Sequence, residues 1–292
     1  MKILYYPGCT IKDTALNFET SAIAVGKVLG IEMQEMKRWN CCGTVYSMAT
    51  DDLMQQLAPI RDLIRVQEEG EDKVVILCSM CYNTIAQANE LVRSDPEKLE
   101  IINAFMDQED PYDGKVNVYH LLSLLIDHVG IDAIAKKVKK PLTGLKIAPY
   151  YGCTTVRPKH VAIDDTEDPQ IMGKILEALG AEIVHDPFNV ECCGSYQTVN
   201  NKNAVAERTY KIVTSARENG ANAIALTCPL CEFNIDFRQE KTQELHPEFK
   251  KIPVFYFTQL MAIALGLDEE TYGFGYHYVD PRPLLKEQGI LK

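Results

Sequence analysis

The sequence predicts an α/β protein made of two tandem, pseudo-symmetric halves, each with a parallel sheet covered by helices. The first observation is that all ten cysteines of the 292-residue chain belong to one pattern of five that occurs twice. The second is that short apolar segments alternate with helical segments in both copies, which is typical of parallel sheets. We therefore predict two domains, residues 1–144 and 145–292, joined at the basic segment Lys139–Gly144.

The repeated pattern is a single cysteine, then Cys-Cys-Gly, then Cys-x-x-Cys. In the first copy 31 and then 35 residues separate these parts, and in the second copy 38 and then 34. The first five are Cys9, Cys41, Cys42, Cys78 and Cys81, and the second five are Cys153, Cys192, Cys193, Cys228 and Cys231. We call these sets the first and the second pentad. A thiol repeated in this way is usually a ligand of a metal or cluster.

Each copy predicts the same order of elements around its cysteines. A buried strand ends at Gly-Cys, a helix closed by glycine follows, and a second strand leads to Cys-Cys-Gly. Another helix and a third strand then lead to Cys-x-x-Cys, and a last strand precedes an apolar helix. The expected first strands lie within 2–9 and 146–153 and end at Gly-Cys, the expected helices are 15–29, 170–179, 52–69 and 203–218, and the third strands 73–77 and 223–227. Ligands of open α/β sheets bind at the carboxyl ends of the strands, so each pentad is expected at that edge.

The two copies differ in one insertion each. The first has an extra acidic helix at about 95–106, and its acidic stretch 97–113 is either a docking surface or a solvated helix. The second has an insertion at 156–168, which carries Arg157, Lys159 and His160.

Composition excludes several classes of function. The net charge of −11 disfavours binding to nucleic acid, which needs a basic face. No stretch reaches the roughly 20 apolar residues of a membrane span, and the start is too short an apolar run for a signal peptide. We therefore expect a cytoplasmic protein, whose thiols serve metal or redox chemistry rather than structural disulfides.

Cysteine spacing alone leaves three kinds of site open. A structural zinc ion takes four ligands and leaves one cysteine of each pentad unused. An iron–sulfur cluster with several irons suits an adjacent Cys-Cys pair better, although neither half has a ferredoxin-type run. A thioredoxin-like dithiol is the third reading of Cys-x-x-Cys. Gly8, Gly43, Gly152 and Gly194 flank the cysteines, where glycine permits close approach to a bulky cofactor.

These motifs resemble the cysteine-rich CCG domain, and the chain as a whole resembles the B subunit of heterodisulfide reductase from methanogenic archaea. The resemblance covers nearly the whole chain and all ten cysteines. It implies two Rossmann-like halves related by a pseudo-twofold axis. It also implies that each pentad holds one noncubane [4Fe-4S] cluster, although one half could hold zinc instead.

The resemblance further implies an activity and partners. The family reduces the mixed disulfide of coenzyme M and coenzyme B, and our hypothesis is that each of two clusters attacks one sulfur of this small-molecule substrate. Electrons would arrive through a C subunit with cubane clusters and a flavin-containing A subunit, fed by a hydrogenase or another donor complex. Two alternatives stay open. One is a CCG electron-transfer subunit of a 2-hydroxy-acid (lactate or glycolate) oxidase, and the other is a zinc-stabilised scaffold without redox activity.

Basic side chains near the cysteines are candidates for binding the anionic groups of the substrate. These candidates are Lys12, Arg38, Arg157, Lys159, His160 and Lys202. His120 and His185 are weaker candidates for supplying a proton. Tyr5, Tyr6, Tyr150 and Tyr151 flank the strand ends, where core packing is the simpler expectation.

Overall fold

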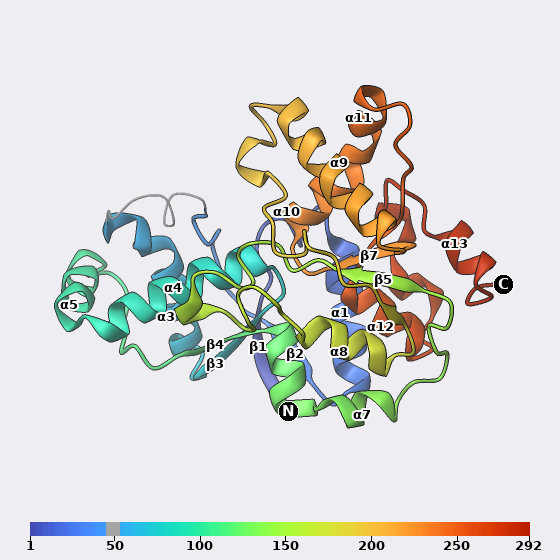
Figure 1. Ribbon diagram of the computed structural model, residues 1–292. Coiled ribbons are helices and arrows are strands. Elements are labelled where there is room, and N and C mark those ends of the chain that lie inside the picture. The colour runs from blue at the N-terminus through green and yellow to red at the C-terminus, as the bar shows by residue number, and fades with distance from the viewer. Residues whose placement is uncertain (45–52) are drawn as a thin grey trace.

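The computed structural model describes residues 1–44 and 53–292 and contains two α/β halves (Figure 1). The elements of the first half are β1 (Lys2–Tyr6), α1 (Leu16–Val28), β2 (Glu32–Glu35), α3 (Leu57–Glu68), β3 (Lys73–Ile76), α4 (Ser79–Ser94), α5 (Pro96–Phe105), β4 (Asn117–His120), α6 (Leu121–Leu124) and α7 (Ile131–Ala135). Those of the second are β5 (Lys146–Pro149), α8 (Ile171–Ala178), β6 (Glu182–Ile183), α9 (Lys202–Glu218), β7 (Ala223–Leu226), α10 (Pro229–Glu232), α11 (Arg238–Leu245), β8 (Val254–Tyr256), α12 (Phe257–Ala264) and α13 (Arg282–Glu287).

Each half contains one four-stranded sheet in which every strand pair is parallel. The strand orders are β2-β1-β3-β4 and β6-β5-β7-β8, so the two sheets have the same topology. The first strand of each half lies inside its sheet and pairs with the second and third strands. This arrangement confirms the predicted fold class of two tandem Rossmann-like halves. The predicted boundary at residue 144 lies between the two sheets and stays a prediction.

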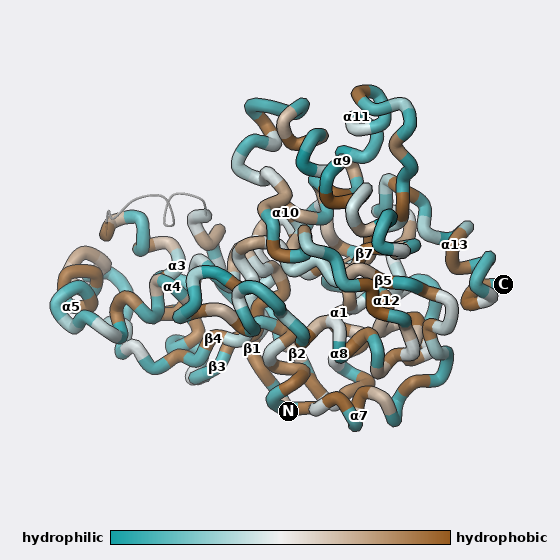
Figure 2. The backbone as a smooth tube through the Cα atoms, in the orientation of Figure 1, coloured by the Kyte–Doolittle hydropathy of each residue, from teal (hydrophilic) through white to brown (hydrophobic). Residues whose placement is uncertain are grey.

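The central strands are apolar because helices cover both faces of each sheet. All four residues of β7 are buried, as are Val74, Val75 and Ile76 of β3. Figure 2 shows hydrophobic residues concentrated around the strands and α12, whereas α9 and α11 at the top of the view are largely hydrophilic. Each fully buried Val or Ile side chain stabilises the fold by about 1.5–3 kcal/mol.

The two halves are joined by the packing of α1 against α12. In Figure 1 the blue α1 of the first half lies beside the red α12 of the second, and the two helices are in contact. The rings of Phe18 and Tyr256 stack with centroids 4.2 Å apart, and the hydroxyls of Ser21 and Thr258 are 2.7 Å apart. These contacts are buried, so the cysteine-bearing edges of the two sheets are held in a defined relation.

The predicted elements differ from the observed ones in a few places. Residue 52, the expected start of a helix, lies outside the described residues, and a short 3₁₀ turn, Leu53–Gln56, precedes α3. The extra acidic helix is confirmed as α5, whereas the insertion at 156–168 contains only the short turn Lys159–Val161. The helices that begin at each Cys-x-x-Cys were not predicted. No helix among residues 1–44 and 53–292 is long and apolar enough to cross a membrane.

Candidate metal centre

Both pentads lie where the strands of their sheets end. Cys9 follows β1, and Cys78 follows β3 and is the residue before the first turn of α4. Cys81 then lies in that first turn. The second half repeats this placement, with Cys228 before α10 and Cys231 within it. The carboxyl ends of neighbouring parallel strands thus bring together thiols that are far apart in the sequence.

The thiols form a row that runs through both halves. Successive thiols in the row interact, and the Sγ atoms of Cys42 and Cys81 are 3.5 Å apart. The order is Cys41, Cys42, Cys81, Cys78, Cys228, Cys231, Cys193, Cys192 and Cys153. Cys9 lies near the Cys41 end. All ten cysteines, which lie within the described part of the chain, are free thiols.

Burial varies along this row. The central thiols, those of Cys78, Cys81, Cys228 and Cys231, are buried. Cys9 and Cys41 at one end are exposed, whereas Cys153 and Cys192 at the other end are partly exposed. A group bound along the row would therefore be sheltered in the middle and accessible at both ends.

Each Cys-Cys pair contains one thiol that ionises readily. Hydrogen bonding with Cys41 and with Cys81 lowers the pKa of Cys42 to about 4. Hydrogen bonds from Cys153 and Cys193 lower the pKa of Cys192 to about 2. Thiolates are the form that binds metals, so each half offers an ionised ligand at neutral pH.

Two glycines allow the backbone to approach the sulfurs closely. Gly8 and Gly152 have φ of +72° and +65°, a region that other residues rarely adopt. A Cβ on Gly8 would lie 3.1 Å from Cys81 Sγ, and one on Gly152 would lie 3.2 Å from Cys231 Sγ. The backbone therefore approaches a cysteine sulfur at these two positions, and the predicted approach to a bulky cofactor stays a prediction. Gly43 and Gly194 differ, because their neighbours belong to the helix that follows.

One buried tyrosine in each half holds the backbone just before the Cys-Cys pair of that half. The Tyr6 hydroxyl donates to the Asn40 carbonyl at 2.8 Å, and that of Tyr150 donates to the Glu191 carbonyl at 2.5 Å. Each carbonyl belongs to the residue that precedes the first cysteine of the pair. The tyrosines are core residues, as expected, and they also position the cysteines. Tyr151 instead accepts bonds from the start of α8, and Tyr5 is buried in the core.

A buried polar network joins the halves beneath the middle of the row. Leu122 N donates to His120 Nδ1 at 3.2 Å, so the ring hydrogen of this neutral imidazole lies on Nε2. His120 Nε2 is 3.1 Å from Thr227 Oγ1 and 3.3 Å from Ser79 Oγ. Burial lowers the pKa of His120 to about 4. This neutral histidine links the residues next to Cys78 and Cys228.

The predicted substrate-binding candidates occupy different settings. Lys12 forms ion pairs with Glu19 and Glu35, and Arg38 forms one with Glu68. Arg157 donates to the Val190 carbonyl at 3.1 Å and pairs with Glu167 at 2.8 Å. The other three candidates are exposed on the surface of the second half, and they are Lys159, His160 and Lys202. The role of all six candidates in binding substrate stays a prediction.

The weaker proton-donor candidate His185 lies away from its expected position. It is exposed and lies beyond the end of β6, rather than within that strand as predicted. β6 consists of only Glu182 and Ile183, so it ends before His185.

Polar residues around the cysteines were missed in the sequence. Asn234 Nδ2 lies 3.4 Å from Cys193 Sγ, and the Thr84 hydroxyl interacts with the Cys42 sulfur. Arg208 Nε donates to the Cys192 carbonyl at 3.2 Å. The only signal in the sequence was that Thr84 and Asn234 each follow a Cys-x-x-Cys by three residues.

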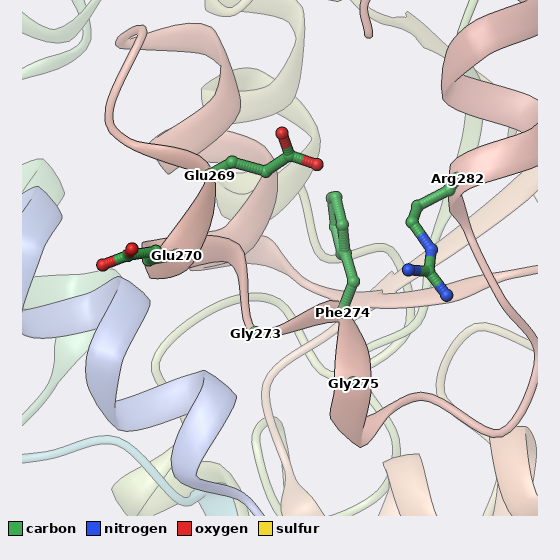
Figure 3. Close-up of a pocket in the computed structure, with 6 residues that line it drawn as sticks. All are labelled: Glu269, Glu270, Gly273, Phe274, Gly275 and Arg282. Atoms are coloured by element: carbon green, nitrogen blue, oxygen red, sulfur yellow. The ribbon is translucent and has the colours of Figure 1, made fainter.

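A surface pocket elsewhere in the molecule involves no cysteine. It lies in the C-terminal segment and is lined by Glu269, Glu270, Gly273, Phe274, Gly275 and Arg282. Figure 3 shows the Phe274 ring standing between the side chains of Glu269 and Arg282. The guanidinium of Arg282 is already paired with Asp280, so this pocket offers less chemistry than the thiol row.

Comparison with known proteins identifies relatives along nearly the full chain. The chain is 30% identical to the 8-methylmenaquinol:fumarate reductase membrane anchor subunit of Wolinella succinogenes, over 96% of this chain and 98% of that one. It is 28% identical to a protein of Archaeoglobus profundus described as like the B subunit of heterodisulfide reductase, over 90% of each chain. It is 26% identical to the B subunit of a CoB-CoM heterodisulfide reductase of Methanosarcina acetivorans, over 93% of this chain and 92% of that one.

One solved structure and the family comparison agree with the fold. A hypothetical protein from Helicobacter pylori superposes with a TM-score of 0.77 at 13% identity, covering 95% of this chain and 51% of that one. The family model described as "Cysteine-rich domain" matches residues 3–86 and 147–236, and so includes all ten cysteines. This chain therefore belongs to the cysteine-rich CCG domain family.

Proposed function

We propose that this protein is the iron–sulfur subunit of a cytoplasmic multi-subunit oxidoreductase, and that it reduces the heterodisulfide of coenzyme M and coenzyme B to two thiols. The observation that carries the proposal is the continuous row of thiols, buried in the middle and accessible at both ends. Such a row suits a reaction in which electrons enter the protein at one place and leave it at another. The names of the Archaeoglobus and Methanosarcina relatives support the choice of substrate.

The donor set fits iron–sulfur clusters better than single ions. Within residues 1–44 and 53–292, no three Cys, His, Asp or Glu side chains converge as around one metal ion. Five thiols extended along a row, with an adjacent pair among them, can reach several iron atoms. We infer that the first pentad holds one noncubane [4Fe-4S] cluster and the second pentad holds another. When bound, these clusters would supply single electrons and an iron site for a thiolate.

The reaction constrains what the residues of the chain must do. Reduction of one disulfide consumes two electrons and two protons and releases two thiols. No eleventh cysteine exists to attack the disulfide by thiol exchange, so the electrons must come from the groups that the pentads hold. The chain carries a net charge of −11, so an anionic substrate needs a local group of basic side chains to bind. The exposed Lys159, His160 and Lys202 would hold its anionic groups. The buried centre of the row keeps water from the inner sulfurs.

The partners that we infer are a C subunit with cubane clusters, a flavin-containing A subunit and a hydrogenase or another electron-donor complex. The relatives are named as subunits, which supports an assembly. The face of α5 supports a docking site for the C subunit. It exposes Ile101 and Phe105 beside the acidic Glu97 and Glu100, and Figure 2 shows brown segments on this peripheral helix. The matching surface of the partner would be apolar with a basic rim.

A direct assay tests the proposed activity. Protein purified without oxygen would receive reduced viologen dye and the heterodisulfide, and thiol release would be followed together with dye oxidation. We expect one disulfide to be cleaved for every two dye molecules oxidised. Protein that holds its iron but releases no thiol would contradict the disulfide-reducing function.

The Wolinella relative favours a second candidate function. It is named as the membrane anchor subunit of an 8-methylmenaquinol:fumarate reductase, and its 30% identity spans nearly the whole of both chains. In this function the chain would pass electrons between a quinol and a flavin-containing partner, the same kind of role as the predicted alternative with a 2-hydroxy-acid oxidase. The discriminating experiment is reoxidation of the dithionite-reduced protein by a soluble menaquinone analogue or by the heterodisulfide. Rapid reoxidation by the quinone alone would favour this second function.

A further inference from the structure

Thr84 and Asn234 occupy the same position in the two halves but present different groups to the sulfurs. Each follows the second cysteine of a Cys-x-x-Cys by three residues. Each interacts with the sulfur of the second cysteine of the Cys-Cys pair in its own half. Thr84 interacts with the Cys42 sulfur, and Asn234 with the Cys193 sulfur. Both residues are buried. The repeat therefore places one polar side chain against one equivalent sulfur in each half.

The amide of Asn234 is oriented so that it donates to the sulfur. Thr198 Oγ1 donates to Asn234 Oδ1 at 2.7 Å, which turns the Nδ2 group toward Cys193 Sγ, 3.4 Å away. Arg238 in turn donates to the Thr198 carbonyl at 2.8 Å. Asn234 also lies in a π-helical turn, Phe233–Phe237, that interrupts the helix between α10 and α11. The equivalent helix α4 runs through Thr84 without such a turn.

The hydroxyl of Thr84 has a single hydrogen for two acceptors. It donates to the Met80 carbonyl at 2.9 Å and also interacts with the Cys42 sulfur. Any bond that it gives to Cys42 is therefore in competition with a stronger acceptor. Asn234 has two amide hydrogens and can direct one of them to Cys193. The second sulfur thus receives a full donated bond from this position, whereas the first shares one.

Hydrogen bonds to cysteine sulfur tune the potential of iron–sulfur sites. A donated bond draws electron density from the sulfur and stabilises the reduced state, which carries more negative charge. We propose that Asn234 is a positioning residue that makes the site of the second pentad easier to reduce than that of the first. This inference rests on the proposed function, because it requires a cluster in each half. Electrons would then move from the first pentad to the second where Cys78 and Cys228 interact electrostatically.

The test changes each of the two side chains and measures reduction potentials. Asn234→Leu removes the donated bond and keeps the branched shape of the side chain, and Thr84→Asn introduces an amide donor in the first half. Thr209→Val is the control, because Thr209 bonds the Asn234 carbonyl at 2.8 Å without contacting a sulfur. Iron and sulfide content would be measured first, followed by anaerobic redox titration monitored by electron paramagnetic resonance and visible absorption.

We expect two reduction steps in the unmodified protein. Asn234→Leu should shift the higher step to a more negative potential, and Thr84→Asn should shift the lower step to a more positive one. The inference is overturned if fully loaded variants leave both steps in place, or if Thr209→Val shifts a step as much as Asn234→Leu does. If Asn234→Leu does not retain iron, an unshifted step in Thr84→Asn overturns it. Unmodified protein without two clusters would instead contradict the proposed function.

Discussion

The thiols of Cys78 and Cys228 interact with each other, although they belong to different halves of the chain. Each is the residue before the first turn of a helix that follows the third strand of its sheet. The packing of α1 against α12 holds the halves in place, and the His120 network links the residues next to these two cysteines. The two pentads are therefore one continuous array, in which the groups they hold would lie within short range for electron transfer.

Replacing the thiol of Cys78 or of Cys228 should remove the group held by the half to which that cysteine belongs. We expect Cys78→Ser and Cys228→Ser each to retain about half of the normal iron and sulfide, because a serine hydroxyl binds iron poorly compared with a thiolate. Metal and sulfide analysis of anaerobically purified variants checks this. Met80→Leu is a matched control, since it changes a buried neighbour with little change in volume. Normal iron content in both serine variants would contradict the assignment of ligands.

Adding a methyl group at Gly8 or Gly152 should disturb the sulfurs directly. Either alanine would suffer the cost of positive φ, about 1–2 kcal/mol, and would press on a cysteine sulfur about 3 Å away. We expect lower thermal stability and loss of iron. Gly30→Ala separates the two effects, because Gly30 has a φ of +81° and no heavy atom within 4 Å of the added carbon. Equal iron loss in all three variants would refute a specific role in approaching the sulfurs.

His120 should make the protein less stable as the pH falls. Burial lowers the pKa of His120 to about 4 from an unfolded value of 6.5, so its contribution is present above pH 6.5 and is lost as the pH falls toward 4. Between pH 7 and 5.5 the expected loss is about 1 kcal/mol. His120→Asn keeps an acceptor for Leu122 N and removes the titrating group. Unfolding would be followed by the fluorescence of Trp39, the single tryptophan. The same pH dependence in the variant would exclude His120 as its source.

Polar substitutions on α5 should weaken binding to the partner. Ile101 and Phe105 are 51% and 57% exposed, which is costly unless a partner covers them. In an anaerobic complex isolated through a tag on this chain, we expect the double variant Ile101→Ser/Phe105→Ser to lose the cubane-cluster subunit and keep its own iron. Ile23→Ser is the control, because Ile23 is 42% exposed on a different helix. An intact complex in the double variant would place the docking site elsewhere.

Much of the fold could be predicted because the repeat records it twice. The helix ends at Gly30 and Gly180 follow from local chemistry and lie where expected. The first strands were expected to end at Gly-Cys, but β1 ends at Tyr6 and β5 at Pro149, before Gly8 and Gly152. The gathering of each pentad followed from the rule that parallel strands end at one edge. The contact between Cys78 and Cys228 could not be predicted, because it depends on how α1 packs on α12.

The polar residues around the cysteines were harder to predict for a different reason. Thr84 and Asn234 differ in side chain, so the comparison of the two copies hides their common position. His120 was paired with Phe257 in the sequence, but its counterpart is Tyr256, which pairs with Leu226 as His120 pairs with Ile76. Only the packed interface shows that His120 Nε2 reaches Thr227 of the other half. Such contacts join residues that the repeat does not pair. Predicting them requires the three-dimensional arrangement of both halves.

The most direct test of the central claim is the content of iron, acid-labile sulfide and zinc per chain in anaerobically purified protein. Two four-iron clusters predict about eight irons with matching sulfide. About four irons with one zinc would leave a single redox site and contradict the two-cluster account. Two zinc ions with no iron, in protein shown not to have lost iron during purification, would make the chain a scaffold and would contradict the redox function itself.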